Sequence, residues 1–158
     1  MPPIHIRCTR HLPMPPAAIV AGIMDLDQWT AFTGFAFLPG IKEARFLQKE
    51  ADITGTRFAI TNTDGSRHEE EIISYVPGQR LSMRLDSFSP PLKTMATHFM
   101  EHWEFTQDAH GTQVVRSMEL FPTSLFFRPM LWFIARFMQK ALDAHLTLMS
   151  KQADEEMN

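Results

Sequence analysis

The pattern of apolar and polar positions predicts a strand and two short helices in the first part of the chain. Over Ile4–Leu12, apolar side chains alternate with polar ones, as on a half-buried strand. Two prolines follow, and the spacing of apolar residues then predicts a helix over Ala17–Met24, where proline suits the first turn. Asp25 can cap a second short helix over Leu26–Phe32.

From Ile41 onward the apolar pattern has a period of two, which predicts further strands. Asp64-Gly65 is a strong hairpin turn signal, and Pro77-Gly78 and Gln107–His110 are further candidate turns. Short strands joined by tight turns indicate an antiparallel meander. The predicted strands are Ile41–Leu47, Gly55–Asn62, Ser66–Val76, Arg80–Phe88, Thr97–Phe105 and Thr112–Phe121.

The last segment changes to a helical period. Apolar residues recur at helical spacing from Met130 to Met149, with polar residues on the opposite face. A helix of about 20 residues is about 30 Å long and can cross a small domain. We expect Asp154–Glu156 to form a frayed acidic tail. Because the chain shows no internal repeat or linker, residues 1–158 are predicted to be one domain.

The order of strand, two helices, strand meander and long closing helix resembles the helix-grip fold of the START/Bet v 1-like (SRPBCC) superfamily, which includes polyketide cyclase/dehydrase-like proteins. The resemblance covers nearly the whole chain. The local motifs that carry it are Pro15-Pro16, Asp25-Leu-Asp-Gln-Trp29, Leu38-Pro-Gly-Ile41, Tyr75-Val-Pro-Gly78, Trp103-Glu-Phe105 and Gly111-Thr112. It implies an α+β fold, a curved antiparallel sheet wrapped around the C-terminal helix, with a cavity that binds lipids, polyketides or other apolar molecules. It carries no shared catalytic signature.

Composition and charge exclude several classes of protein. The net charge is -3 and the basic residues are scattered, which argues against nucleic-acid binding. Cys8 is the single cysteine, so no intrachain disulfide is expected, and without a recognisable signal peptide we expect a cytoplasmic protein. The most apolar stretch, Leu125–Met138, contains two arginines and a proline and is shorter than the ~18 residues of a spanning helix.

The 13 Phe and 11 Met residues indicate an adaptable apolar interior. We predict that alternating strand positions and the apolar side of the terminal helix surround the ligand, and that the loop bearing Phe35 and Phe37 forms the cavity mouth. The predicted ligand-binding residues are Phe35, Phe37, Phe58, Tyr75, Leu81, Met83, Leu85, Phe99, Glu101, Trp103, Val114, Arg116, Met118, Leu120, Met130, Ile134, Phe137 and Met138.

The most informative polar candidates are Glu101 and Arg116, in the last predicted hairpin. If Gln107–His110 form a four-residue loop, Glu101 lies opposite Arg116 on the apolar face, where the two would form an inward ion pair. Three interpretations stay open: a structural pair, a polar anchor for the ligand, or a catalytic acid/base pair.

Other polar motifs carry weaker signals. His98 and His102 lie four residues apart on a strand, about 13 Å from each other, so no metal site is predicted there. For the run His68–Glu71, a two-residue turn would direct Glu69 and Glu71 inward, and a longer loop would reverse this. His145 lies on the apolar stripe of the terminal helix as a further polar candidate. No nucleotide or cofactor motif is present, and we expect no cofactor.

Three functions remain. The first is a carrier that binds a small hydrophobic molecule without covalent chemistry. The second is a polyketide cyclase/dehydratase-like enzyme that uses Glu101 and Arg116. The third is association with a membrane surface or a partner protein through Leu125–Met138, whose aromatic residues exceed what one cavity can cover. A monomer and a homodimer are both compatible with the sequence.

Overall fold

The computed structural model describes residues 1–158 and consists of seven strands, three α-helices and two 3₁₀ helices, the latter labelled η. The elements are β1 (Ile4–Leu12), α1 (Pro16–Ile23), η1 (Leu26–Ala31), β2 (Ile41–Gln48), β3 (Arg57–Asn62), β4 (Arg67–Val76), β5 (Arg80–Asp86), α2 (Leu92–Met95), β6 (Ala96–Asp108), β7 (Gly111–Pro122), η2 (Leu125–Phe127) and α3 (Arg128–Met157). No helix has the length and apolar character needed to cross a membrane.

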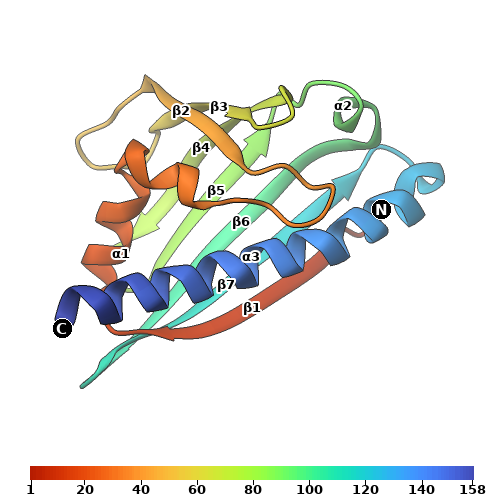
Figure 1. Ribbon diagram of the computed structural model, residues 1–158. Helices are drawn as coiled ribbons and strands as arrows, with labels where there is room; N and C mark the ends of the chain where they lie inside the picture. Colours follow the sequence, from red (N-terminus) through yellow and green to blue (C-terminus); the bar gives the residue numbers. More distant parts are fainter.

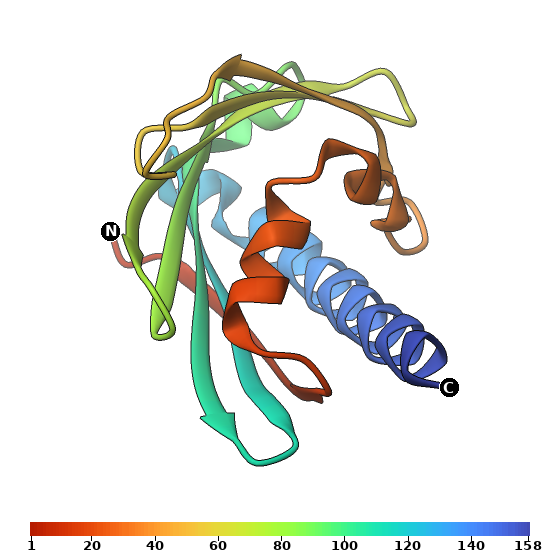
Figure 2. The same cartoon turned by 90° about the vertical axis from the view of Figure 1, so that its left-hand side faces the viewer.

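The seven strands form one antiparallel sheet in the order β1-β7-β6-β5-β4-β3-β2. The sheet curves strongly, and α3 runs across its concave side, packed against β1 and β7 (Figure 1). Figure 2 shows the sheet as an arc, with α1 and η1 on the same concave side as α3. The predicted helix-grip architecture is therefore confirmed.

The core lies between the concave face of the sheet and α3. Along β7, and from Phe99 to Phe105 on β6, every second residue is buried, because side chains of a strand alternate between the two faces. The largest fully buried side chains include Phe58 of β3 and Phe99 of β6. Trp29 fixes η1 on this core, since its ring lies 4.6 Å from that of Phe58 and its Nε1 donates to the Ile23 carbonyl at 2.8 Å.

The hairpin β6–β7 differs from the predicted register by two residues. Its turn consists of Ala109 and His110 alone, so Glu101 lies opposite Met118, and Arg116 lies opposite Trp103. The Asp108 carboxylate tightens this turn by accepting a hydrogen bond from the backbone N–H of His110 at 2.7 Å. A shift of two residues preserves the face of every side chain, so Glu101 and Arg116 both point inward.

The C-terminal helix is longer than predicted. It continues to Met157, so the acidic residues Asp154–Glu156 belong to the helix and do not form a frayed tail. Ala153 is buried and anchors this last part of α3. At the other end, Met130 is exposed although its spacing placed it on the apolar stripe, because the buried stripe there runs through Leu131 and Ala135.

Candidate functional site

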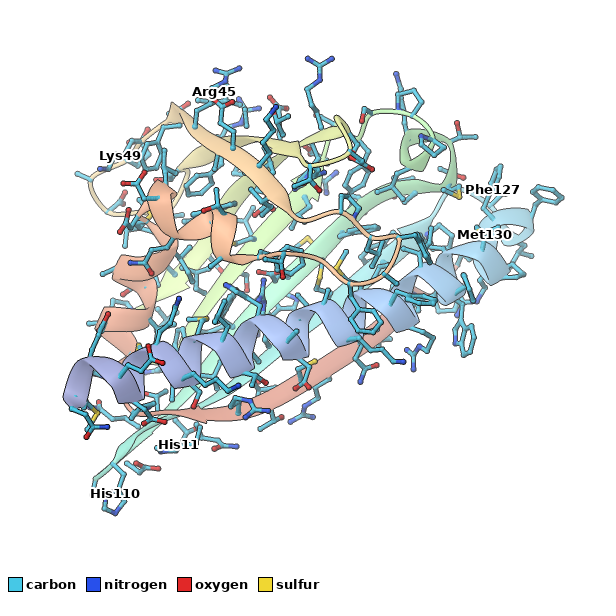
Figure 3. All side chains as sticks on the ribbon, viewed as in Figure 1. His11, Arg45, Lys49, His110, Phe127 and Met130 are labelled. Atoms are coloured by element: carbon cyan, nitrogen blue, oxygen red, sulfur yellow. The ribbon has the colours of Figure 1, made fainter.

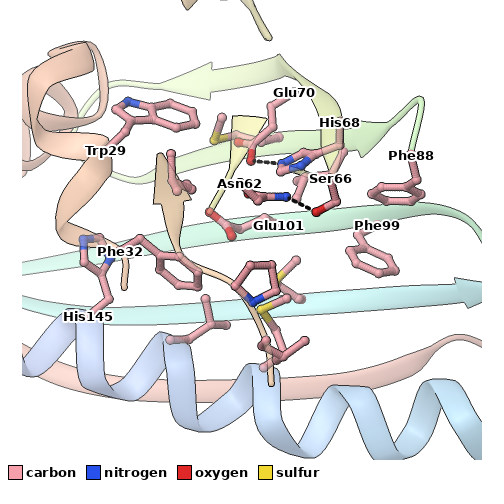
Figure 4. Close-up of a pocket in the computed structure, with 18 of the residues that line it drawn as sticks. Trp29, Phe32, Asn62, Ser66, His68, Glu70, Phe88, Phe99, Glu101 and His145 are labelled. Atoms are coloured by element: carbon pink, nitrogen blue, oxygen red, sulfur yellow. Dashed lines mark hydrogen bonds and ion pairs between the residues drawn. The ribbon is translucent and has the colours of Figure 1, made fainter. Parts of the chain in front are cut away.

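A cavity of about 620 Å³ lies between the concave face of the sheet, η1 and α3. Its walls are mainly apolar, and Trp29, Phe32, Phe88 and Phe99 contribute aromatic surfaces (Figure 4). The loop between η1 and β2 closes one side through residues such as Phe37 and Leu38. The volume falls in the range of about 300–1,000 Å³ that is usual for small-molecule sites.

The structure brings part of the predicted ligand-binding set to this cavity. The predicted residues that line it are Phe37, Met83, Leu85, Phe99, Glu101, Trp103, Arg116, Met118, Ile134 and Met138. The others lie elsewhere: Phe58, Leu81, Val114 and Leu120 are buried in the surrounding core, Tyr75 and Phe137 are half-buried, and Phe35 and Met130 are exposed. The alternating pattern identified buried positions, and only part of the buried set borders the cavity.

Glu101 and Arg116 form an ion pair on the cavity wall. Arg116 Nη2 donates to both carboxylate oxygens of Glu101 at 3.3 Å, and the two residues are only 6% and 7% exposed. Trp103 Nε1 also donates to Glu101 at 2.8 Å. The guanidinium lies over the Trp103 ring, 4.3 Å from its centroid, so a buried cation is stabilised by both charge and aromatic surface.

His145 of α3 completes this polar cluster from the helix side. Arg116 Nη1 donates to His145 Nδ1 at 2.9 Å. Burial, together with the adjacent Arg116 charge, lowers the pKa of His145 to about 3, so the imidazole is neutral at physiological pH. A neutral imidazole with Nδ1 as acceptor carries its proton on Nε2 and can donate from that atom.

A second polar group, Glu70 with His68, lies on the same concave face. Glu70 is 8% exposed, and one of its oxygens lies 2.9 Å from His68 Nε2 (Figure 4). Burial raises the pKa of Glu70, and the nearby charge of Glu101 acts in the same direction. The hydrogen bond from His68 acts in the opposite direction, so the cavity holds one carboxylate paired with an arginine and one carboxyl group whose pKa is raised by burial.

The sequence did not decide that Glu70 and His68 face inward. The turn around Asp64-Gly65 is a three-residue loop, Thr63–Gly65, between the paired residues Asn62 and Ser66, so Glu70 lies opposite Phe58 and His68 lies opposite Ile60. This shift of one residue relative to a two-residue turn turns Glu69 and Glu71 away from the cavity. The sequence pointed to this site only through the charge run His68–Glu71. The length of the preceding loop decides whether His68 and Glu70 or Glu69 and Glu71 face the cavity.

No group of three or more His, Cys, Asp or Glu side chains is placed to hold a metal ion. His102 contacts Ser82 and Glu119 on the outer face of the sheet, at 2.7 and 3.1 Å. His98 stacks on Phe121, with ring centroids 4.2 Å apart. His98 and His102 therefore have different neighbours and do not converge on a common site.

Comparison with known proteins supports the same fold. The model of the family described as polyketide cyclase / dehydrase and lipid transport matches residues 3–153. The structure is similar to that of TTHA0849 from Thermus thermophilus, with a TM-score of 0.72 at 16% identity over 98% of this chain and 100% of that chain. A START superfamily protein from Mycobacterium smegmatis gives a TM-score of 0.69 at 12% identity over 94% and 97% of the two chains.

A further similar structure is the di-domain ARO/CYC StfQ from the steffimycin biosynthetic pathway. It gives a TM-score of 0.73 at 15% identity and covers 99% of this chain and 52% of that chain. At these identities the similarity concerns the fold alone. No curated protein matches the sequence.

Proposed function

Since the chain belongs to the family of polyketide cyclases, dehydrases and lipid transport proteins, we propose that it binds one small hydrophobic molecule between the sheet and α3, as a carrier. The observation that carries this proposal is the cavity of about 620 Å³, because a close-packed core would leave no such space. Residues 1–158 act as one ligand-binding domain in this proposal. Its apolar contacts are Met83, Leu85, Phe99, Met118, Ile134 and Met138.

The polar cluster favours a neutral ligand with a hydroxyl or carbonyl group. Arg116 donates from Nη1 to His145 and from Nη2 to Glu101, and the Glu101 carboxylate already balances its charge. An incoming carboxylate would therefore bring a second negative charge into the cavity without a cation to balance it, which is unfavourable. A hydroxyl group adds no charge, and the lone pairs of Glu101 can accept its hydrogen bond, with the Glu70 carboxyl group as a further polar partner.

The proposal is tested with N-phenyl-1-naphthylamine, a neutral dye whose fluorescence rises in apolar cavities. We expect the dye to bind one site per chain, and decan-1-ol to displace it at a concentration about tenfold lower than decanoate, the ratio given by about 1.4 kcal/mol. In Glu101→Gln the Arg116 charge loses its partner, so the preference should shift toward decanoate. Both ligands have the same chain length, so their difference reports on the polar end.

Glu104→Gln is the matched control, because it makes the same change on the outward-facing side of β6. This variant should bind both ligands as the wild type does. Absence of any saturable dye binding would contradict the cavity-binding function. Equal displacement by decanol and decanoate in the wild type would refute the neutral-ligand preference while leaving the cavity function intact.

A second candidate function is catalysis of a dehydration or aldol-type cyclisation by the same cluster. The observation that favours it is the contrast between two carboxyl groups: Glu101 is paired with Arg116, and burial raises the pKa of Glu70. Glu101 would take a proton from the carbon next to a carbonyl. The bond to the β-hydroxyl group would break, and the leaving oxygen would take the proton of Glu70 and depart as water.

The probe for this reaction is 4-hydroxy-4-phenylbutan-2-one, whose dehydration gives a conjugated ketone that is followed by ultraviolet absorbance. Enzymatic function predicts conversion above the buffer rate, and loss of that excess in both Glu101→Gln and Glu70→Gln. Binding of the probe without conversion would leave the carrier function and exclude catalysis on this substrate class.

A further inference from the structure

One end of the molecule exposes a continuous set of large apolar side chains, which we call the aromatic rim. Its most exposed members are Phe126, at 83%, and Leu125, at 71%. Figure 3 labels Phe127 and Met130 at this end of α3. The aromatic rim consists of Phe35 and Phe37 from the loop between η1 and β2, and of Leu125, Phe126, Met130, Trp132 and Phe133 from η2 and the start of α3.

The two segments of the rim are joined by ring contacts. The Phe37 ring stacks on that of Phe133, with 6.0 Å between centroids, and lies 4.7 Å from that of Phe137. Phe35 also contacts Phe137, at 6.1 Å. Residues far apart in the sequence thus form one surface, which the fold keeps out of the core. An exposed patch of this kind marks an interaction surface.

The charged residues of the rim's own segment in η2 and α3 are all positive. The segment Leu125–Leu142 contains Arg128, Arg136 and Lys140 and no acidic residue, although the whole chain has a net charge of -3. Two of these cations lie directly over rim rings: Arg136 is 5.2 Å from the Trp132 ring and Lys140 is 5.4 Å from the Phe35 ring. Apolar and aromatic side chains flanked by Lys and Arg are typical of surfaces that bind anionic membranes.

The rim is also continuous with the cavity wall. Phe37 belongs to both, since it is 56% exposed and lines the cavity. The neighbouring Leu38 and Pro39 line the cavity from the same loop, and Ile134 and Met138 line it from α3. Any partner surface that binds the aromatic rim would therefore also contact the residues that close this side of the cavity.

We propose that the aromatic rim docks onto anionic lipid bilayers, with Leu125, Phe126 and Trp132 inserted at the interface and Arg128, Arg136 and Lys140 placed against the lipid headgroups. A bilayer is favoured over a second copy of the chain because a two-fold interface would bring the same three cations of both copies together. A bilayer with anionic lipids neutralises them. Docking would let an apolar ligand pass between bilayer and cavity, a consequence that rests on the proposed carrier function.

The docking is tested by co-sedimentation with vesicles of pure phosphatidylcholine and of phosphatidylcholine with about 30% phosphatidylserine, an anionic content like that of a cytoplasmic leaflet. The wild type should bind the anionic vesicles at least about tenfold more strongly than the neutral ones, and binding should weaken at high salt. Leu125→Ala/Phe126→Ala and Arg136→Gln/Lys140→Gln should each lose about tenfold or more in affinity. The fluorescence of Trp132 should shift to the blue on binding.

Ile73→Ala/Val76→Ala is the matched control, because it removes two exposed apolar side chains from β4, away from the rim. Equal sedimentation of this control and the rim variants would contradict the proposal, as would absence of wild-type binding to both vesicles. Dimerisation without vesicles that is lost in Leu125→Ala/Phe126→Ala would reassign the rim to a second copy of the chain.

Dye binding separates this proposal from the carrier function. Leu125 and Phe126 do not line the cavity, so their double variant should bind N-phenyl-1-naphthylamine as the wild type does. Vesicle binding without dye binding would retain the rim and refute the carrier function. Dye binding without vesicle binding would retain the carrier function and refute the docking.

Discussion

Replacing His145 with glutamine should make the chain less sensitive to acid. His145 accepts a hydrogen bond from Arg116 inside the molecule, and burial lowers its pKa from 6.5 to about 3. A glutamine side chain keeps an acceptor oxygen for Arg116 and does not titrate. The variant therefore removes the proton-binding difference between the folded and the unfolded chain at this position.

The size of the effect follows from the two pKa values. As the pH falls below 6.5, the unfolded chain binds a proton at His145 while the folded chain does not, so the wild type loses stability down to about pH 3. Linkage gives a loss of about 2 kcal/mol between pH 7.5 and pH 5.0 from this residue. Relative to the wild type, His145→Gln should gain about 2 kcal/mol over the same range.

The assay is urea unfolding followed by tryptophan fluorescence, with Trp29 and Trp103 as reporters beside the cavity. The free energy of unfolding of both proteins is measured at several pH values between 5.0 and 7.5. Glu70 contributes to both proteins in the same way, so its effect cancels in the difference. His110→Gln is the control, because it removes a histidine that is exposed, at the turn between β6 and β7.

A constant difference between His145→Gln and the wild type across this pH range would refute the reasoning. So would an NMR titration in which the His145 ring takes a proton near pH 6.5 in the folded protein. Either result would mean that the imidazole is hydrated or that Arg116 does not hold it, and the neutral-donor description of His145 would be wrong.

Two further predictions concern stability. Phe58→Ala should lower the free energy of unfolding by about 3–5 kcal/mol, because the ring is fully buried against Trp29. A decrease below about 1 kcal/mol in urea unfolding would show that neighbouring side chains fill the space left by the ring. Arg116→Met should lose about 3–5 kcal/mol because Glu101 stays buried without its cation. The double variant Glu101→Leu/Arg116→Met should recover at least half of that loss, and no recovery would show that the pair itself contributes the stability.

The sequence specified which face of each long strand is buried, and this was enough to find the central ion pair. Side chains alternate strictly along a strand, so Glu101 and Arg116 share the apolar face in any register that differs by two residues. The turn at Ala109-His110 was shorter than predicted, and the opposing residues changed without moving either charge to the outside. The pair was therefore predictable, although its neighbours were not.

The run His68–Glu71 gives the opposite result, since a change of one residue in the loop selects a different pair of side chains. A two-residue turn at Asp64-Gly65 would direct Glu69 and Glu71 inward, and the observed three-residue loop, Thr63–Gly65, directs His68 and Glu70 inward. The backbone N–H of Asn62 donates to the Ser66 carbonyl at 2.8 Å, and this contact closes the loop. Turn geometry depends on such local contacts, which hydrophobic periodicity does not report.

The sequence by itself determined the order of the elements, their antiparallel pairing and the long apolar helix, because these follow from local periodicity and turn residues. The tertiary structure alone decided which buried side chains border a cavity and which apolar residues stay outside. Phe58 and Phe99 have the same pattern in the sequence, yet only Phe99 lines the cavity. Periodicity shows which side of a helix or strand is buried. A cavity depends on how closely separate helices and strands pack against one another, which periodicity does not show.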